Sequence, residues 1–274
     1  MPEVAVETLL RSSSVTIRDI RCRGACRHQS PEECATATEL VFPYRGVYAR
    51  HLGRNQAIAE ANQVLFFNAG DGYRVSHPVA GGDACLSLAL DEDLLREFAP
   101  NALLREGPGL AFHHHRLRID PGAQALVARL RQGLRTHAAE PLEAESLAMA
   151  LVARALGPRT TRAPGGSAGR QRLADRVKLV LAGDLGRRWT LGQVAAEVGM
   201  SPVYLTQVFK EVEGLPLYRY QLRLRLARAL DLLDGYDDLT ALSLDLGFSS
   251  HSHFSAAFRT AYGRSPSAFR RPSR

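Results

Sequence analysis

Residues 190–212, TLGQVAAEVGMSPVYLTQVFKEV, carry the signals for two short helices joined by a tight turn. Thr190 and Gln193 form a capping box, a pattern that predicts a helix beginning directly after Thr190. Gly199 can adopt the left-handed backbone conformation that ends this helix and turns the chain. Ser201 is followed directly by a proline, and together they provide an N-cap and a first-turn proline for a second helix. We therefore expect a helix-turn-helix unit.

The second of these helices has an apolar face and a polar face. Its apolar residues recur at the i, i+3, i+4 and i+7 spacing of a buried stripe. The outward face consists of Val203, Thr206, Gln207 and Lys210. In helix-turn-helix proteins this face enters the DNA major groove. Glutamine suits adenine, threonine can hydrogen-bond a base or touch a thymine methyl, and lysine can reach phosphate or guanine.

The chain then repeats the pattern. Gly247 follows Gly199 by 48 residues, Asp238 can cap the helix before it, and Ser249 or Ser250 can cap the helix after it. The first buried residue of that last helix comes one position later than in the first unit, which predicts a slightly different turn. The outward face of the last helix holds His251, Ser252, Ser255 and Arg259. The alternative to DNA binding is that the two hairpins form an ordinary core or a protein-interaction surface.

A stretch of 18 residues, Pro216 to Leu233, connects the two units and has helical apolar spacing. A helix of that length spans roughly 27 Å, and successive major-groove faces on one side of B-DNA lie about 34 Å apart. A rigid connecting helix could therefore hold both units near the spacing of the grooves. Arg219 and Arg223 lie four residues apart on one face of it. They are candidates for phosphate contacts, or they belong to an ordinary solvated face.

The positive charge of the chain is concentrated in its second half. The 274 residues carry a formal net charge of +7. Residues 159–274 contain 18 Lys and Arg against 10 Asp and Glu, whereas residues 1–158 contain 17 against 18. A basic part joined to a nearly neutral part is expected when one domain meets nucleic acid and the other has a different role.

A segment rich in glycine and proline separates these two parts. Residues 158–169 lack apolar periodicity, as linkers do. We therefore expect one domain at residues 1–157 and a second, all-α domain at residues 170–274. The overall fold class predicted is α+β.

The first domain changes in character along its length. Branched and aromatic residues alternate over residues 15–90, which predicts an antiparallel β-barrel or sandwich. Apolar residues at four-residue spacing then predict a pair of helices, residues 121–137 and 141–156. No apolar run approaches the roughly 20 residues of a membrane span, and residues 1–14 lack the basic leader of a secretory signal. We expect a cytoplasmic protein without a membrane segment.

The second domain carries a dense set of residues shared with one known family. They are Ser201, Tyr204, Leu205, Phe209, Lys210, Gly214, Tyr220, Arg225, Leu226, Ala229, Leu232, Leu233, Gly247, Phe248, Ser249, Ser252, His253, Phe254, Phe258, Tyr262, Gly263, Ser265, Pro266, Phe269 and Arg270. With these residues the domain resembles the AraC/XylS family of bacterial transcriptional regulators. The resemblance implies a seven-helix double helix-turn-helix domain on double-stranded DNA, whose first recognition helix is usually the more sequence-specific. Ser243 and Ala256 depart from the family pattern, so the second unit is expected to contact mainly the DNA backbone.

The first domain resembles, more weakly, the cupin-like module that many such regulators use for ligand binding and dimerisation. The similarity lies in PYRG, residues 43–46, and FFNAGDGYRVSHP, residues 66–78. The H-x-H cluster with a following glutamate that a metal-binding cupin needs is missing, so we expect no enzyme and no cofactor. Arg45, Tyr73 and His77 are candidates for an effector pocket, or they are satisfied structural groups.

Three cysteines and a histidine lie close together in sequence. Cys22, Cys26, His28 and Cys34 offer ligands that zinc or a soft metal prefers. Neighbouring arginines could instead lower a thiol pKa and favour a reversible disulfide. The spacing fits no compact zinc-knuckle pattern, and the remaining Cys85 lies in an apolar run typical of a core.

The main enzymatic alternative also depends on these cysteines. Residues 22–26, CRGAC, are similar to the C-R-x-x-C of Ada-type methyl-accepting DNA repair domains, but the second C-x-x-C pair of those domains is missing. The sequence therefore predicts a DNA-binding regulator without catalysis that responds to a small-molecule effector. A homodimer formed through residues 121–156 is expected, and RNA polymerase is a candidate further partner.

Overall fold

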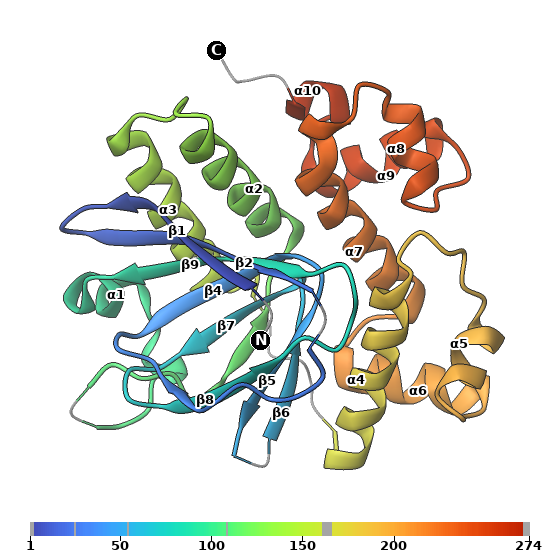
Figure 1. Ribbon diagram of the computed structural model, residues 1–274, viewed down its shortest axis with the longest axis horizontal. Helices are drawn as coiled ribbons and strands as arrows, with labels where there is room; N and C mark the ends of the chain where they lie inside the picture. The colour runs from blue at the N-terminus through green and yellow to red at the C-terminus, as the bar shows by residue number, and fades with distance from the viewer. Residues whose placement is uncertain (1–2, 25, 54, 108, 161–165, 271–274) are drawn as a thin grey trace. The chain divides into compact units, whose positions relative to one another are not determined.

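Figure 1 shows the computed structural model of the protein. The residues described are 3–24, 26–53, 55–107, 109–160 and 166–270. The chain divides into two compact units, Met1–Arg162 and Ala163–Arg274. Residues 161–165 of the predicted linker lie outside the described residues. The last two residues of that linker, Ala168 and Gly169, already belong to a helix that begins at Ala168.

Two antiparallel sheets form the β-part of the N-terminal unit. A six-stranded sheet has the order β1-β2-β9-β4-β7-β10, and a four-stranded sheet has the order β3-β8-β5-β6. The bounds are β1 Glu3–Arg11, β2 Val15–Arg23, β3 Glu33–Cys34, β4 Glu39–Arg45, β5 Tyr48–Leu52, β6 Asn55–Ala59, β7 Gln63–Phe67, β8 Gly72–Ser76, β9 Asp83–Leu90 and β10 Arg116–Arg118. All of the neighbouring strand pairs are antiparallel.

The larger sheet is buried on both faces along strands β4, β7 and β9, whereas its edge strand β1 is mostly exposed. Successive side chains of a strand point to opposite faces, so Val64 and Phe66 join one apolar core while Leu65 and Phe67 join another. The first core lies between the sheet and the helices, and the second contains side chains from both sheets, such as Tyr48 of β5. The unit therefore has three layers: helices, the six-stranded sheet and the four-stranded sheet.

Three helices supply the outer layer, namely α1 Glu92–Phe98, α2 Pro121–Arg135 and α3 Pro141–Leu156. Helix α2 packs against α3 and against strands β1 and β4. The guanidinium of Arg154, near the end of α3, donates to both carboxylate oxygens of Asp120, the N-cap of α2, at 2.7 and 2.6 Å. The predicted α+β class with a β-domain and a helical pair is confirmed, although α2 ends at Arg135 rather than at 137.

The C-terminal unit is helical throughout its described part (Figure 1). Its helices are α4 Ala168–Gly183, α5 Leu191–Glu197, α6 Pro202–Glu213, α7 Leu217–Leu232, α8 Leu239–Asp245, α9 His251–Tyr262 and α10 Pro266–Arg270. The two predicted helix-turn-helix units are α5 with α6 and α8 with α9. Among the described residues, no helix combines the length and the apolar character needed to cross a membrane.

The two helix-turn-helix units have helices of the same lengths but differ at the turn. In each, a seven-residue helix precedes a twelve-residue helix. The capping box of Thr190 and Gln193 is present, and Ser201 caps α6. Ser250, not Ser249, caps α9, so one more residue separates it from Gly247 than separates Ser201 from its glycine. The predicted register difference therefore lies wholly in the turn.

The turn glycines of the two units have different surroundings. Both have positive φ, +66° at Gly199 and +78° at Gly247, where an L side chain is strained. A Cβ at Gly199 would meet nothing within 4 Å, but a Cβ at Gly247 would lie 2.0 Å from the carbonyl oxygen of Gly186. The second turn therefore needs glycine for close backbone approach as well as for its conformation.

We expect Gly247→Ala to destabilise the protein by about 3 kcal/mol or more, and Gly199→Ala by only about 1–2 kcal/mol. Both variants pay the cost of the left-handed conformation, but only the first also displaces backbone. Urea unfolding of the full-length variants measures the difference. Equal losses in the two variants would contradict the role given to the approach of Gly186.

Candidate nucleic-acid interface

Helix α6 presents the polar face that its sequence pattern predicts. Leu205 and Phe209 are fully buried, whereas the side chain of Val203 is 69% exposed. Thr206, Gln207 and Lys210 are exposed as well. The hydroxyl of Thr206 donates to the carbonyl of Pro202 at 2.9 Å, which holds its oxygen against the helix. The structure thus brings the four predicted residues together on one surface.

A buried ion pair holds the end of α6 against α4. The ammonium of Lys178 lies 2.7 Å from a carboxylate oxygen of Glu213, and both side chains are almost completely excluded from solvent. Removing one member of such a pair leaves an uncompensated buried charge, at a cost of about 3–5 kcal/mol. The position of α6 therefore depends on polar as well as apolar contacts.

Helix α9 exposes its predicted face with one exception. His251, Ser252 and Arg259 are exposed, but Ser255 is half-buried and its hydroxyl lies 3.3 Å from Nε2 of His251. In the preceding helix, Ser243 is fully buried and donates to the carbonyl of Thr240 at 2.8 Å. Its hydroxyl is thereby satisfied locally, which explains how the helix accommodates serine at a closely packed position.

Helix α7 contacts both helix-turn-helix units. It packs against α6, where the rings of Phe209 and Tyr220 meet edge to face at 5.1 Å between centroids, and against α9. Arg219 is exposed, with its Nε donating to the hydroxyl of Tyr218 at 3.0 Å, and Arg223 is half-buried. Arg219 therefore lies on the outer side of the connecting helix, whereas Arg223 is only partly accessible.

Arg225 of α7 contacts the loop before the first helix-turn-helix unit and the turn of the second. Its guanidinium donates to the carbonyls of Leu185, Gly247 and Arg187, at 3.0, 3.1 and 2.7 Å. Burial and the neighbouring charge of Arg188 lower the pKa of Arg225. Leu185 lies in the loop between α4 and α5, and Gly247 forms the turn between α8 and α9, so Arg225 joins the loop before the first helix-turn-helix unit to the turn of the second. In the sequence Arg225 stands out only as a residue shared with the family, and no local pattern reveals its contacts with these carbonyls.

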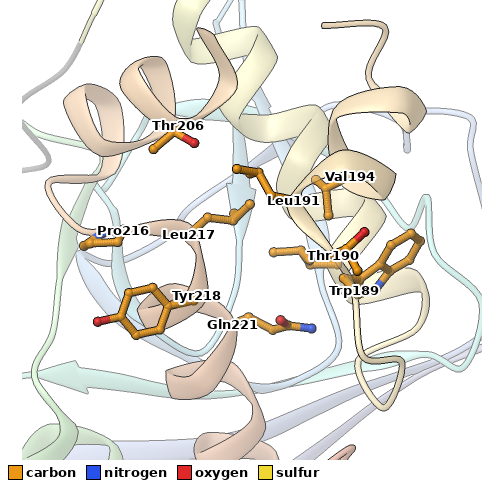
Figure 2. Close-up of a pocket in the computed structure, with 10 residues that line it drawn as sticks. Trp189, Thr190, Leu191, Val194, Thr206, Pro216, Leu217, Tyr218 and Gln221 are labelled. Atoms are coloured by element: carbon orange, nitrogen blue, oxygen red, sulfur yellow. The ribbon is translucent and has the colours of Figure 1, made fainter. Parts of the chain in front are cut away.

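A small cavity lies beside the first unit, and Figure 2 shows its lining. Its volume is about 260 Å³, and Leu191 and Val194 of α5 face Leu217, Tyr218 and Gln221 of α7 across it. Thr206 reaches its edge from α6. Leu191 and Tyr218, both of them exposed, contribute apolar surface to its lining.

The three predicted effector residues, Arg45, Tyr73 and His77, are not part of the lining of the two cavities described here, of about 260 and 550 Å³. His77 is buried, with Nδ1 2.5 Å from Oδ2 of Asp83, and the hydroxyl of Tyr73 donates to a carboxylate oxygen of Glu33 at 3.0 Å. Arg45 is half-buried beside the ring of Tyr44. A cavity of about 550 Å³ in the N-terminal unit has a different lining, which includes Thr36, Thr38, Glu92, Leu95, Arg105 and Leu110.

The four candidate metal ligands named from the sequence, Cys22, Cys26, His28 and Cys34, do not form a ligand cluster among the described residues. Cys34 is exposed on β3, and the thiol of Cys26 donates to the carbonyl of His28 at 3.5 Å. All four cysteines are free thiols. The potential ligands that do meet among the described residues are Cys22, His77 and Asp83. Proximity in sequence does not reveal this group, because strand pairing places Cys22 opposite Asp83.

Comparison with known proteins identifies the N-terminal unit and the C-terminal unit. Residues 5–170, more than half of the chain, match the model of the regulatory protein PchR N-terminal domain, and residues 194–272 match a helix-turn-helix domain. The chain belongs to the AraC/XylS family of transcriptional regulators. It is therefore a DNA-binding regulator of transcription, and its resemblance to this family is confirmed.

Individual relatives of this AraC-family regulator match it over different lengths. The HTH-type transcriptional regulator GadX of Escherichia coli is 28% identical over 82% of this chain and 85% of its own. The Msm operon regulatory protein of Streptococcus mutans is 30% identical, but the match covers only 35% of each chain. A structure described as a transcriptional regulator with an AraC-type DNA-binding domain, from Chromobacterium violaceum, is 28% identical over 39% of this chain and all of its own, with a TM-score of 0.36.

We expect Arg225→Lys to lower the free energy of unfolding by about 1–3 kcal/mol and to weaken DNA binding, although Arg225 lies among protein carbonyls. Lysine keeps the charge but lacks the planar fork that reaches three acceptors. Denaturant unfolding and DNA titration of the full-length protein measure both effects. Arg176→Lys, on an exposed part of α4, is the matched control, and equal behaviour of the two variants would contradict the structural role of Arg225.

Proposed function

We propose that this regulator reads two adjacent major grooves of one duplex, with α6 in the first groove and α9 in the second. The observation that supports this most directly is the bond network of Arg225, which joins the start of the first unit to the turn of the second. A fixed separation is needed if both helices are to meet grooves about 34 Å apart. The basic charge of the C-terminal half supplies the general attraction for phosphate.

The two recognition helices have different chemistry. On α6, Gln207 and Thr206 can hydrogen-bond base edges, Val203 can contact a thymine methyl and Lys210 can reach phosphate or guanine. On α9, the residues that can contact DNA are His251, Ser252, Ser255 and Arg259, which lie beside the small Ala256. We propose that α6 carries most of the sequence selectivity and that α9, with Arg219 and Arg223 of α7, contacts mainly the backbone.

We expect the double variant Thr206→Ala with Gln207→Ala to lose roughly 10- to 100-fold in its preference for an operator over unrelated DNA, since a good base contact contributes about 1–3 kcal/mol. Arg223→Ala is the contrasting variant, because loss of a phosphate contact weakens binding to all DNA alike and lowers the salt slope by about one. Titrations over a range of salt, on a site found by genome-wide mapping, separate the two. Selectivity that survives the double substitution would refute the assigned face.

We also propose that the protein is a homodimer and that the outward face of α3 forms the contact. The exposed or half-exposed residues along this face include Leu142, Ser146, Met149, Ala150 and Ala153, with the exposed Glu143 at its border. Leu142 is 75% exposed. A mainly uncharged stripe over three turns of the solvent-facing side of a helix is typical of a helix that packs against a partner.

We expect Ala150→Arg to convert the dimer to monomer, because it places a charge and a long side chain at the middle of this stripe. Sedimentation velocity at several concentrations measures the change. Ala138→Arg, exposed in the loop between α2 and α3, should leave the dimer intact. A dimer that persists in Ala150→Arg would show that the contact lies elsewhere.

We propose further that the N-terminal unit binds a small-molecule effector. We also propose that the regulator acts in the cytoplasm, that it has no catalytic activity and that it acts through RNA polymerase. The cavity lined by Thr38 and Arg105 is large enough for a small metabolite, and the matched family model is that of a regulatory domain. Mapping the genomic sites that the protein occupies tests this. Metabolites handled by the neighbouring genes can then be titrated against the purified protein, with Ala37→Phe, which narrows this cavity, as the variant expected to lose the response.

A further inference from the structure

Three residues from separate parts of the N-terminal unit meet at one end of the core between its two sheets. Cys22 lies on β2 and Asp83 at the start of β9, and the two are direct cross-strand partners. Their neighbours in the same ladder, Ile20 and Cys85, belong to the apolar core between the sheets. Because side chains alternate along a strand, Cys22 and Asp83 point to that same core.

His77 reaches this point from the smaller sheet. It follows β8 directly, and its backbone is held by two hydrogen bonds to Cys26, at 2.9 and 2.7 Å. Its Nδ1 lies 2.5 Å from Oδ2 of Asp83. One ligand atom from each of Cys22, His77 and Asp83 lies within 4.8 Å of the other two, and all three residues are buried, with exposed fractions of 5 to 7%.

We propose that Cys22, His77 and Asp83 form a binding site for one Zn²⁺ ion. Thiolate, imidazole and carboxylate are the ligands that Zn²⁺ uses, and three protein ligands leave its fourth position for water or another small ligand. Ligand atoms around tetrahedral zinc are separated by roughly 3.3–3.8 Å. The three ligand atoms already lie within 4.8 Å of one another, close to that spacing.

The charge balance at this site favours a divalent cation. A thiolate and a carboxylate carry two negative charges together, which Zn²⁺ neutralises in a place where an uncompensated buried charge is costly.

Binding at this place would connect the two sheets. Cys22 and Asp83 belong to the six-stranded sheet, and His77 continues from the four-stranded one. A bound ion would therefore link the sheets at one end of the core and stabilise the folded unit, since a ligand that binds only the native state raises its stability by mass action. The site uses one of the cysteines that the sequence offers as ligands, but with partners 55 and 61 residues further along the chain.

The test uses the full-length protein freed of metal and titrated with Zn²⁺ against a chromophoric chelator, and with Co²⁺ as a spectroscopic probe. We expect one ion per chain, a near-ultraviolet charge-transfer band from thiolate to Co²⁺ and a higher melting temperature. Cys22→Ser should abolish the band. Asp83→Asn and His77→Gln keep the thiol, so the band should remain while affinity falls about 10-fold or more.

Cys34→Ser is the matched control, because this thiol is exposed on β3. It should leave stoichiometry, band and affinity unchanged. Circular dichroism establishes which variants are folded, and if Cys22→Ser is not, the affinities of Asp83→Asn and His77→Gln decide. Failure of the wild-type protein to bind a stoichiometric ion, a band that survives in folded Cys22→Ser, or unchanged affinity in both other variants would overturn the proposal. None of these results depends on DNA binding.

Discussion

The guanidinium of Arg225 is the constraint on which the double arrangement of the C-terminal unit depends. Two helix-turn-helix units on one chain act on one duplex only if their separation is fixed, and a helix fixes it only if each unit is attached to that helix. Arg225 makes the attachment through carbonyls that lie before α5 and at the turn before α9. Gly247 completes it, because only a residue without Cβ lets the second turn approach Gly186 so closely.

The same unit shows how structural and reading surfaces are separated. Buried contacts such as those of Lys178 with Glu213 and of Phe209 with Tyr220 position α6 from behind. The side chains of its other face, with Val203 and Gln207 among them, have no part in these contacts. Operator preference can therefore change by substitution on the exposed face without loss of the fold, as expected of a family with one fold and many operators.

The N-terminal unit uses a sheet that is buried on both faces, and this is why it offers internal sites. One face supports the helices, and the other encloses a second core into which polar groups also point. In that core Cys22, His77 and Asp83 lie together. The outward face of α3 is the second feature of this unit to which we assign a role, as the contact between two copies of the chain.

Local patterns in the sequence determined the helix-turn-helix units almost completely. Capping by Thr190 and Ser201, turning at Gly199 and the apolar stripe of α6 are short-range effects, so they can be read from neighbouring residues. The exposed polar face of α6 followed from the same periodicity, whereas Ser255 on α9 and Arg223 on α7 are half-buried.

Long-range pairing decided what the sequence could not. Cys22 was grouped with Cys26, His28 and Cys34 because they are near in sequence, but the register of β2 with β9 gives it Asp83, and the end of β8 adds His77. Likewise, no local signal shows that Arg225 bonds carbonyls 22 to 40 residues away. A strand's partner and a buried side chain's acceptor are set by the folded chain as a whole, and so the tertiary structure alone revealed them.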